Sequence, residues 1–209
     1  MKNQNTLYMI CSDMEGIFTP EIWINVAEKT GIPELRLTTR DVPDYDVLMK
    51  GRLALLHQHK ITLKEIQKVI ATLSPLQGSL ELLNWLRSRY PTIIVSDTYI
   101  EFAGPLLEKL GWPTLFCHSL ITNSDGMIHD YKLRQIDGKR MTVISLKNLN
   151  YKVIGIGDSY NDISMLKESN AAILFRPPDA VKQEYSQFPV AYSYDELKTH
   201  ILNITDHRI

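Results

Sequence analysis

Short apolar runs alternate along the chain with segments in which apolar residues recur every three or four positions. The short runs are typical of buried strands, and the recurring pattern is typical of amphipathic helices. Strands are predicted at residues 7–11, 92–95, 115–118, 152–156 and 172–175. Because strands that alternate with helices build parallel sheets, the pattern predicts an α/β fold with a doubly wound, mostly parallel sheet.

The segment between the first two predicted strands is an exception, because it carries helical patterns only. Helices are predicted here at residues 21–30, 45–59 and 62–73, with a polar, proline-containing stretch at 38–44. We therefore expect an all-helical insert of residues 20–74 in an α/β core formed by residues 1–19 and 75–209.

The rest of the chain predicts further helices and one hairpin. Helices are expected at residues 76–90, 101–110, 139–149, 161–169 and 194–202. Asn123–Gly126 is a strong turn signal between two strand-like arms. Residues 119–134 are therefore expected to form a β-hairpin beside the main sheet.

The amino-acid composition excludes several classes of protein. The 209 residues are 44% hydrophobic and 22% charged, with a formal net charge of −1. Proteins that bind nucleic acid or membrane surfaces carry a large basic excess, so we expect no nucleic acid and no membrane as partner. Two cysteines are too few for a disulfide scaffold, and the first residues lack the features of a signal peptide. A cytoplasmic protein is expected, and the sequence leaves open whether it forms a homodimer.

Polar residues follow three of the predicted strands at the point where each strand ends. These are Ser12–Asp13, Ser96–Asp97 and Gly157–Asp158. A single aspartate in such a position is often a helix cap or a turn former. Since ligands of open parallel sheets bind at the carboxyl ends of the strands, three such positions together indicate a binding site.

Asp13 and Glu15 are two residues apart on the turn after the first predicted strand. An extended turn with this spacing can present both carboxylates to one cleft. One carboxylate could then act as a nucleophile and the other as a general acid and base. Gly16 permits a tight backbone geometry in which amide groups face an anion.

Asp158 and Asp162 form a second acidic pair, spaced to share one side of the first turn of a helix. Oxygen ligands without adjacent histidine or cysteine favour Mg²⁺ over zinc. The Ser96 hydroxyl and the Lys139 ammonium group suit phosphate oxygens. A lysine in such a position is more often a solvated surface residue, and its neighbour Arg140 is a competing candidate.

These residues occur in order along the chain and together resemble the four-motif signature of the haloacid dehalogenase superfamily. The insert is then similar to the helical cap of that superfamily. A more detailed similarity links the chain to the phosphoserine phosphatase group that also transfers phosphate to homoserine. The segments that carry this similarity are GIFTPEIWINVAEKTGI, TTRDVPDYDVLMKGRL, VIATLSPLQG, VSDTY and GDSYNDISML.

The resemblance implies a role for each matching catalytic residue. Asp13 would attack phosphorus and become an aspartyl-phosphate. Glu15 would protonate the leaving oxygen and later deprotonate the attacking water. Ser96 and Lys139 would hold the phosphoryl oxygens.

The resemblance also implies Mg²⁺ as the cofactor. Asp13, the carbonyl group of Glu15 and Asp158 would hold the ion, which neutralises charge as the phosphoryl group moves. Asp162 would support this metal site, directly or through water, and Asn161 would orient ligands nearby.

Two positions depart from the broad superfamily pattern. The acid/base position is usually aspartate and here is Glu15. Ser96 is followed by Asp97–Thr98 where ordinary phosphoserine phosphatases have glycines, so we expect Asp97 to contact the substrate. Both departures are similar to the subgroup that transfers phosphate, and they leave the balance of hydrolysis and transfer open.

Two residues of the insert are candidates for substrate choice. Arg52 shares an apolar helix face with Leu48 and Leu55, where its guanidinium could extend into water or bind a carboxylate. The resemblance favours binding of the serine carboxylate. Glu21 matches a residue that contacts the substrate ammonium group, although acidic residues are also common at the start of a helix.

The sequence therefore predicts a Mg²⁺-dependent phosphoserine phosphatase that releases L-serine and phosphate, with homoserine as an open second acceptor. One alternative is a phosphatase for another small phosphomonoester. An alternative of another class is a receiver-like signalling module phosphorylated on aspartate, which would leave the insert unexplained. A dinucleotide-binding module is disfavoured, because no G-x-G-x-x-G follows a predicted strand.

Overall fold

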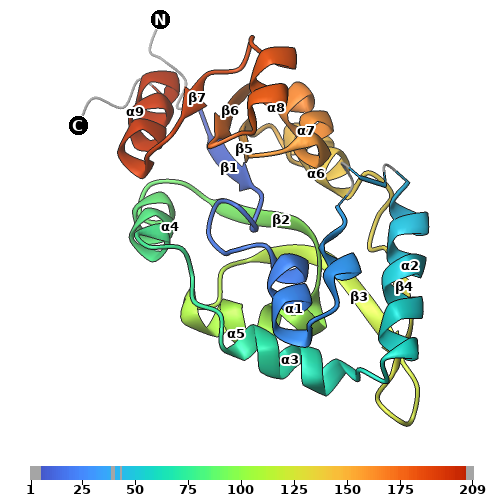
Figure 1. The fold of residues 1–209 in the computed structure, drawn as a ribbon. Helices are drawn as coiled ribbons and strands as arrows, with labels where there is room; N and C mark the ends of the chain where they lie inside the picture. Colours follow the sequence, from blue (N-terminus) through green and yellow to red (C-terminus); the bar gives the residue numbers. More distant parts are fainter. Residues whose placement is uncertain (1–5, 39–40, 43, 206–209) are drawn as a thin grey trace, which may run out of the picture.

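Seven strands form one sheet in the computed structural model, which describes residues 6–38, 41–42 and 44–205. Residues 39, 40 and 43 of the expected polar stretch and the first five residues lie outside this description. The strand order is β4-β3-β2-β1-β5-β6-β7, and every neighbouring pair is parallel except β3 and β4 (Figure 1). The strands are β1 (Tyr8–Ser12), β2 (Thr92–Tyr99), β3 (Leu115–Thr122), β4 (Ile128–Lys132), β5 (Lys152–Gly157), β6 (Ala171–Phe175) and β7 (Val190–Ala191). The predicted α/β class and mostly parallel sheet are confirmed.

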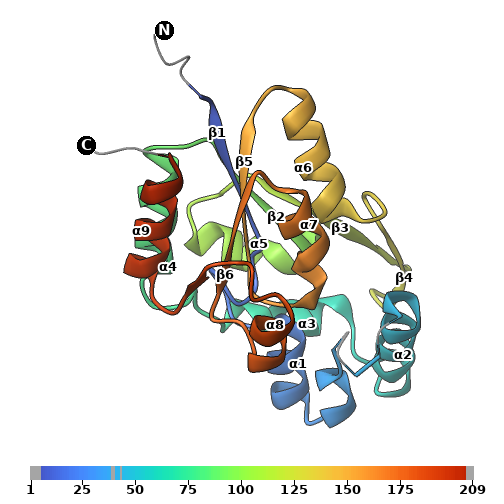
Figure 2. The ribbon, with the colours of Figure 1, turned by 90° about the horizontal axis from the view of Figure 1, so that it is seen from above.

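Helices cover both faces of the sheet. Successive side chains of the central strand β1 point to opposite faces, so β1 contributes to a hydrophobic cluster on each face. Met9 and Cys11 of β1 pack with one set of helices, whereas Ile10 packs with the other. The helices lie on both sides of the sheet (Figure 2). The first set is α6 (Gly138–Asn148), α7 (Ile163–Glu168) and α8 (Asp179–Glu184). The second set includes α4 (Ser79–Arg87), α5 (Ile100–Lys109) and α9 (Tyr194–Thr205). Within the described residues, no helix is long and apolar enough to cross a membrane.

Between residues 20 and 74, the regular secondary structure of the described residues is all helical. It comprises α1 (Ile22–Thr30), the 3₁₀ turn η1 (Pro33–Arg36), α2 (Tyr45–Gln58) and α3 (Leu63–Ala71). Local chemistry fixes the starts of two of these helices. The Asp44 side chain accepts hydrogen bonds from two backbone N–H groups of α2, and Thr62 forms a capping box with Glu65 at α3.

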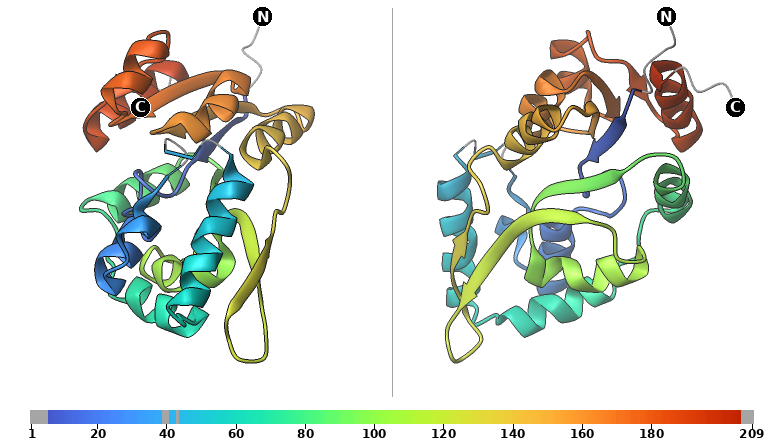
Figure 3. Two further views of the ribbon diagram at one scale, coloured as in Figure 1. Left: turned by 45° about the vertical axis from the view of Figure 1, so that its right-hand side comes forward. Right: turned by 180° about the vertical axis from the view of Figure 1, so that it is seen from behind.

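Two of the contacts between these helices and the rest of the chain are extensive. Helix α3 packs against α5, and α2 packs against β4, so that the hairpin runs beside α2 (Figure 3). Two hydrogen bonds fix the second contact: Tyr131 donates its hydroxyl to Asp46 Oδ1 at 2.7 Å, and His57 Nε2 lies 3.0 Å from the Ile128 carbonyl oxygen. The predicted boundaries at residues 19 and 75 stay a prediction.

Two strands are longer than the sequence pattern predicts. Strand β2 continues past Val95 to Tyr99, so Ser96 and Asp97 lie within it and do not follow it. Its pairing with β3 shifts register between Val95 and Tyr99, which interrupts the regular ladder where the polar residues occur. Strand β3 also extends, because its second half pairs with β4, and the expected separate hairpin is the edge of the main sheet.

Candidate active site

A cavity of about 380 Å³ opens at the carboxyl ends of β1, β2 and β5. Helices α1 and α2 contribute the residues on its other side. Nine of the ten predicted site residues line the cavity: Asp13, Glu15, Glu21, Arg52, Ser96, Asp97, Lys139, Asp158 and Asn161. The tenth, Asp162, is fully buried and contacts Lys139. The fold thus brings together residues that are up to 149 positions apart in the sequence.

Asp13 lies where β1 ends, and only 4% of its surface is exposed. Its backbone N–H donates to the Ile156 carbonyl oxygen of β5 at 2.9 Å, which ties the turn to the neighbouring strand. The Met14 N–H donates to Asp13 Oδ1 at 2.7 Å. These two hydrogen bonds leave Oδ2 facing Lys139, so the carboxylate has a fixed orientation at the bottom of the cavity.

Two glycines allow the acidic residues to come close to the backbone. Gly16 has φ of 77°, and a Cβ atom there would lie 2.6 Å from Asp158 Oδ2. A Cβ atom at Gly157 would lie 2.4 Å from the Asp162 Cβ. Real Cβ atoms do not approach other atoms this closely, so side chains at either position would displace the carboxylates.

Lys139 joins the carboxylates of three different segments. Its Nζ lies 2.7 Å from Asp162 Oδ1, 3.1 Å from Asp13 Oδ2 and 3.5 Å from Asp97 Oδ2. Burial alone would lower the pKa of this ammonium group, but the three carboxylates raise it well above the ordinary value. Lys139 is therefore a buried cation, and the expectation that such a lysine is usually solvated does not hold here. Arg140 instead points away from the cavity to Glu168, 3.2 Å from its Nε.

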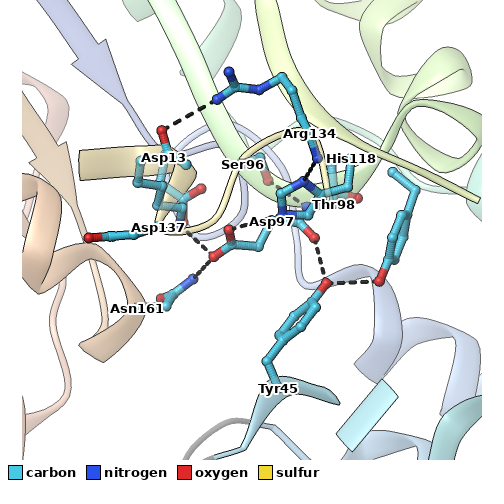
Figure 4. A network of polar contacts seen from close by, with 12 residues as sticks. Asp13, Tyr45, Ser96, Asp97, Thr98, His118, Arg134, Asp137 and Asn161 are labelled. Atoms are coloured by element: carbon cyan, nitrogen blue, oxygen red, sulfur yellow. Dashed lines mark hydrogen bonds and ion pairs between the residues drawn. The ribbon is translucent and has the colours of Figure 1, made fainter. Parts of the chain in front are cut away.

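Asp97 is held from both sides at the rim of this cluster (Figure 4). Asn161 Nδ2 donates to Asp97 Oδ2 at 3.1 Å, and His118 Nε2 lies 3.6 Å from Oδ1. The Arg134 backbone N–H donates to His118 Nδ1 at 3.1 Å, which leaves Nε2 to carry the ring hydrogen that faces Asp97. Burial acts to raise the pKa of Asp97, but Lys139 above all, with His118 and Asn161, holds it well below its usual range.

Glu15 accepts a hydrogen bond at Oε2 from the Ile22 N–H, the first residue of α1, at 2.8 Å. Burial and, next, the neighbouring Glu21 raise the pKa of Glu15 to about 8. Glu21 precedes α1 as its N-cap residue but makes no side-chain capping bond. Its carboxylate lines the cavity, and its place before α1 also fits the other interpretation of this residue, an acidic group at the start of a helix.

Arg52 of α2 is 7% exposed, so its guanidinium does not extend into water. It lies over the Trp23 ring, 4.5 Å from the centroid, and its NH2 donates to the Leu37 carbonyl oxygen at 2.6 Å. The buried Nε has no hydrogen-bond partner. Burial lowers the pKa of Arg52 to about 10. A buried cation with an unsatisfied donor is suited to an anionic group of a ligand.

Three carboxylates fit a divalent cation. One oxygen each from Asp13, Asp158 and Asp162 lies within 4.8 Å of the others. Burial and then Asp162 raise the pKa of Asp13 well above its usual value, and the same two causes with Glu21 raise the pKa of Asp158 to about 7. Such crowding of oxygen donors disfavours the ionised forms unless a cation binds, and hard divalent cations prefer oxygen ligands.

Three further residues of the cavity carry no distinctive sequence signal. They are Trp23 of α1, Tyr45 of α2 and His118 of β3. Tyr45 donates to the Asp97 carbonyl oxygen at 3.1 Å and lies 2.8 Å from the Tyr99 hydroxyl. These residues reach the cavity through strand order and helix packing. The position of His118 could have been predicted only from the pairing of β3 with β2.

A family model described as haloacid dehalogenase-like hydrolase matches residues 17–170, beginning just after Asp13 and Glu15. Two curated relatives are each 51% identical to this chain over 199 residues, which is 95% of its length. One is a phosphoserine phosphatase of Pseudomonas syringae pv. tomato, of which the match covers 84%. The other is phosphoserine phosphatase ThrH of Pseudomonas aeruginosa, of which it covers 97%.

Solved structures show the same fold at lower identity. A phosphoserine phosphatase in its apo form matches with a TM-score of 0.74 at 20% identity, over 97% of this chain and 99% of that chain. A phospho-aspartyl intermediate analogue of phosphoserine phosphatase also matches with a TM-score of 0.74, at 19% identity, over 93% of this chain and 99% of that chain. At these identities the likeness concerns the fold.

Proposed function

Since this chain belongs to the haloacid dehalogenase-like hydrolases, we propose that it is a phosphoserine phosphatase that acts through an aspartyl-phosphate on Asp13. The observation that carries this proposal is the position of the Asp13 carboxylate, which is buried, oriented by the Met14 N–H and 3.1 Å from the Lys139 ammonium group. The two relatives at 51% identity support phosphoserine as the substrate. A receiver-like module is disfavoured by the match to a hydrolase family.

In the first half of the reaction, an Asp13 oxygen attacks phosphorus and the bond to the serine oxygen breaks. Lys139 and the Ser96 hydroxyl bind the phosphoryl oxygens. Glu15 donates its proton to the departing serine oxygen, for which its raised pKa is suited. In the second half, Glu15 takes a proton from water, the water oxygen attacks phosphorus, and phosphate leaves as the Asp13 carboxylate re-forms.

Asp13, the Glu15 carbonyl group and Asp158 would hold a Mg²⁺ ion, which would neutralise charge on the phosphoryl group. Asp162 would support this site from the protein interior, where its side chain is fully buried. Its Oδ2 accepts hydrogen bonds from the Asp158 and Ser159 N–H groups at 2.9 and 3.1 Å, and its Oδ1 contacts Lys139. With both oxygens engaged, we propose that Asp162 positions Asp158 and Lys139.

We propose that residues 20–74 form a cap that supplies substrate contacts, over a core of residues 1–19 and 75–209. Arg52 would bind the serine carboxylate, since its guanidinium is buried against Trp23 and its Nε has no partner. Glu21 would face the ammonium group. Asn161 would orient ligands through its contact with Asp97.

A screen of small phosphomonoesters in the presence of Mg²⁺ tests the substrate assignment. Phosphoserine is expected to give the highest kcat/KM. A clear preference for a phosphomonoester without an amino-acid group would replace phosphoserine with another substrate.

We further propose that homoserine can replace water as acceptor, because Glu15 can deprotonate a hydroxyl group as it does water. Adding homoserine to the phosphoserine reaction is expected to produce phosphohomoserine, detected by ³¹P NMR. Production of inorganic phosphate alone would limit the activity to hydrolysis.

A further inference from the structure

The reaction steps above give the side chain of Asp97 no role beyond its contact with Asn161, although it faces the cavity beside the proposed phosphoryl site. Its carboxylate is 34% exposed and lies 3.5 Å from the ammonium group of Lys139. The same ammonium group lies 3.1 Å from Asp13 Oδ2. A phosphate that contacts both Asp13 and Lys139 must therefore bind close to a second, fixed negative charge.

The contacts of Asp97 restrict its movement away from this site. Asn161 holds Oδ2, and His118 faces Oδ1 from a strand on the other side. His118 is itself 6% exposed and is oriented by the Arg134 backbone. Tyr45 fixes the backbone of Asp97, because its hydroxyl donates a hydrogen bond to the Asp97 carbonyl oxygen. The carboxylate is thus built into the cavity and is not a mobile surface charge.

We propose that Asp97 weakens the binding of free inorganic phosphate and so promotes emptying of the site after each turnover. Phosphate released from Asp13 carries at least one negative charge and meets a carboxylate that cannot swing away. Repulsion between like charges at this range is substantial in a partly buried site. Lys139 attracts the phosphate, and Asp97 offsets part of that attraction.

The proposal rests on the proposed function only in that phosphate is a product bound at Asp13. The test is the inhibition constant of inorganic phosphate, measured against hydrolysis of p-nitrophenyl phosphate in the presence of Mg²⁺. Asp97→Asn is expected to lower this constant by about tenfold, because the amide keeps the size of the side chain and removes its charge. The Asn161 amide can reverse to preserve its hydrogen bond.

Asp137→Asn is the matched control. Asp137 also lines the cavity, but at its mouth, where it is 39% exposed and lies 3.7 Å from Arg140. Its φ of 49° is one that asparagine adopts readily, so the variant removes a charge with little strain. Its phosphate inhibition constant is expected to change less than about twofold, because among the described residues Asp137 pairs with Arg140 and not with the Lys139 ammonium group beside the proposed phosphate site.

Calorimetric titration with inorganic phosphate in the presence of Mg²⁺ gives a second measurement that needs no turnover. Asp97→Ser serves as a second variant if Asp97→Asn does not fold. An unchanged phosphate affinity in the folded variant, or an equal change in Asp137→Asn, would overturn the proposal. Failure to hydrolyse phosphoserine would overturn only the substrate assignment, since neither measurement uses phosphoserine.

Discussion

The buried cations on the two sides of the cavity differ in how many carboxylates of the protein surround them. On the core side, the buried Lys139 ammonium group is matched by the carboxylates of Asp13, Asp97 and Asp162 at 2.7–3.5 Å. On the helical side, the described structure shows no carboxylate within ion-pair distance of Arg52, whose buried Nε has no partner. On one side the buried cation is outnumbered by carboxylates of the protein. On the other side Arg52 makes no ion pair among the described residues, so a ligand can supply its anionic partner.

The difference teaches how one small cavity can separate chemistry from recognition. The phosphoryl site needs groups held in fixed positions before the substrate binds, and mutual ion pairs provide that. Recognition needs a charge whose best partner belongs to the substrate, because only then does binding the right molecule gain free energy. The following predictions test this division.

The largest expected effect is the loss of the proposed nucleophile, Asp13, on the core side. Asp13→Asn is expected to lower kcat by about a thousandfold or more, because an amide oxygen is a poor nucleophile. The variant should fold, since the amide can still accept the Met14 N–H hydrogen bond. Steady-state kinetics with phosphoserine give the result, and rates near those of the wild type would remove Asp13 from the nucleophile role.

The next effect concerns stability on the core side. Lys139→Met is expected to lower the free energy of unfolding by about 3–5 kcal/mol, because it leaves buried carboxylates without their cation. Urea unfolding in the absence of metal measures this change. Arg140→Met is the neighbouring control: its ion pair with Glu168 is exposed, so about 1 kcal/mol or less is expected. Equal losses in both variants would contradict a core side whose buried carboxylates depend on Lys139.

The central strands and the acidic residues near their carboxyl ends could be predicted from local patterns. The role of Lys139 was implied by the family resemblance, because its local pattern favours a solvated side chain. Apolar runs located the central strands, and the residues at their carboxyl ends had to meet at one edge of the sheet. The ends of β2 and β3 could not be predicted, since pairing with β3 and β4 extends these strands through polar residues such as Ser96. Tertiary pairing overrode the local pattern there.

Fewer features of the helical side could be predicted from the sequence. The periodicity of α2 places Arg52 on an apolar face but is equally compatible with a guanidinium in water. Its burial against Trp23 depends on how α1, η1 and α2 come together, which no local pattern encodes. His118 shows the same limit, because its role depends on the register between β2 and β3.

A smaller effect is expected from the helical side. Arg52→Met keeps most of the packing on Trp23 and removes the charge. The kcat/KM for phosphoserine is expected to fall about 10- to 100-fold, mainly through KM, because a charge-assisted contact to the substrate carboxylate is lost. With phosphoethanolamine, which has no carboxylate, the change should stay below about threefold. Equal losses with both substrates would mean that Arg52 does not recognise the carboxylate.

The smallest expected effect is the stabilisation of the core side by the proposed Mg²⁺ ion. At a Mg²⁺ concentration about tenfold above its Kd, binding to the folded state adds about 1.4 kcal/mol, or roughly 3–5 °C in Tm. Asp158→Asn should abolish this shift, because it removes one of three clustered carboxylates. Arg52→Met should retain the shift, because Arg52 belongs to the other side of the cavity. Thermal unfolding with and without Mg²⁺ therefore tests both sides of the cavity without turnover. Loss of the Tm shift in both variants would show that the two sides are not independent.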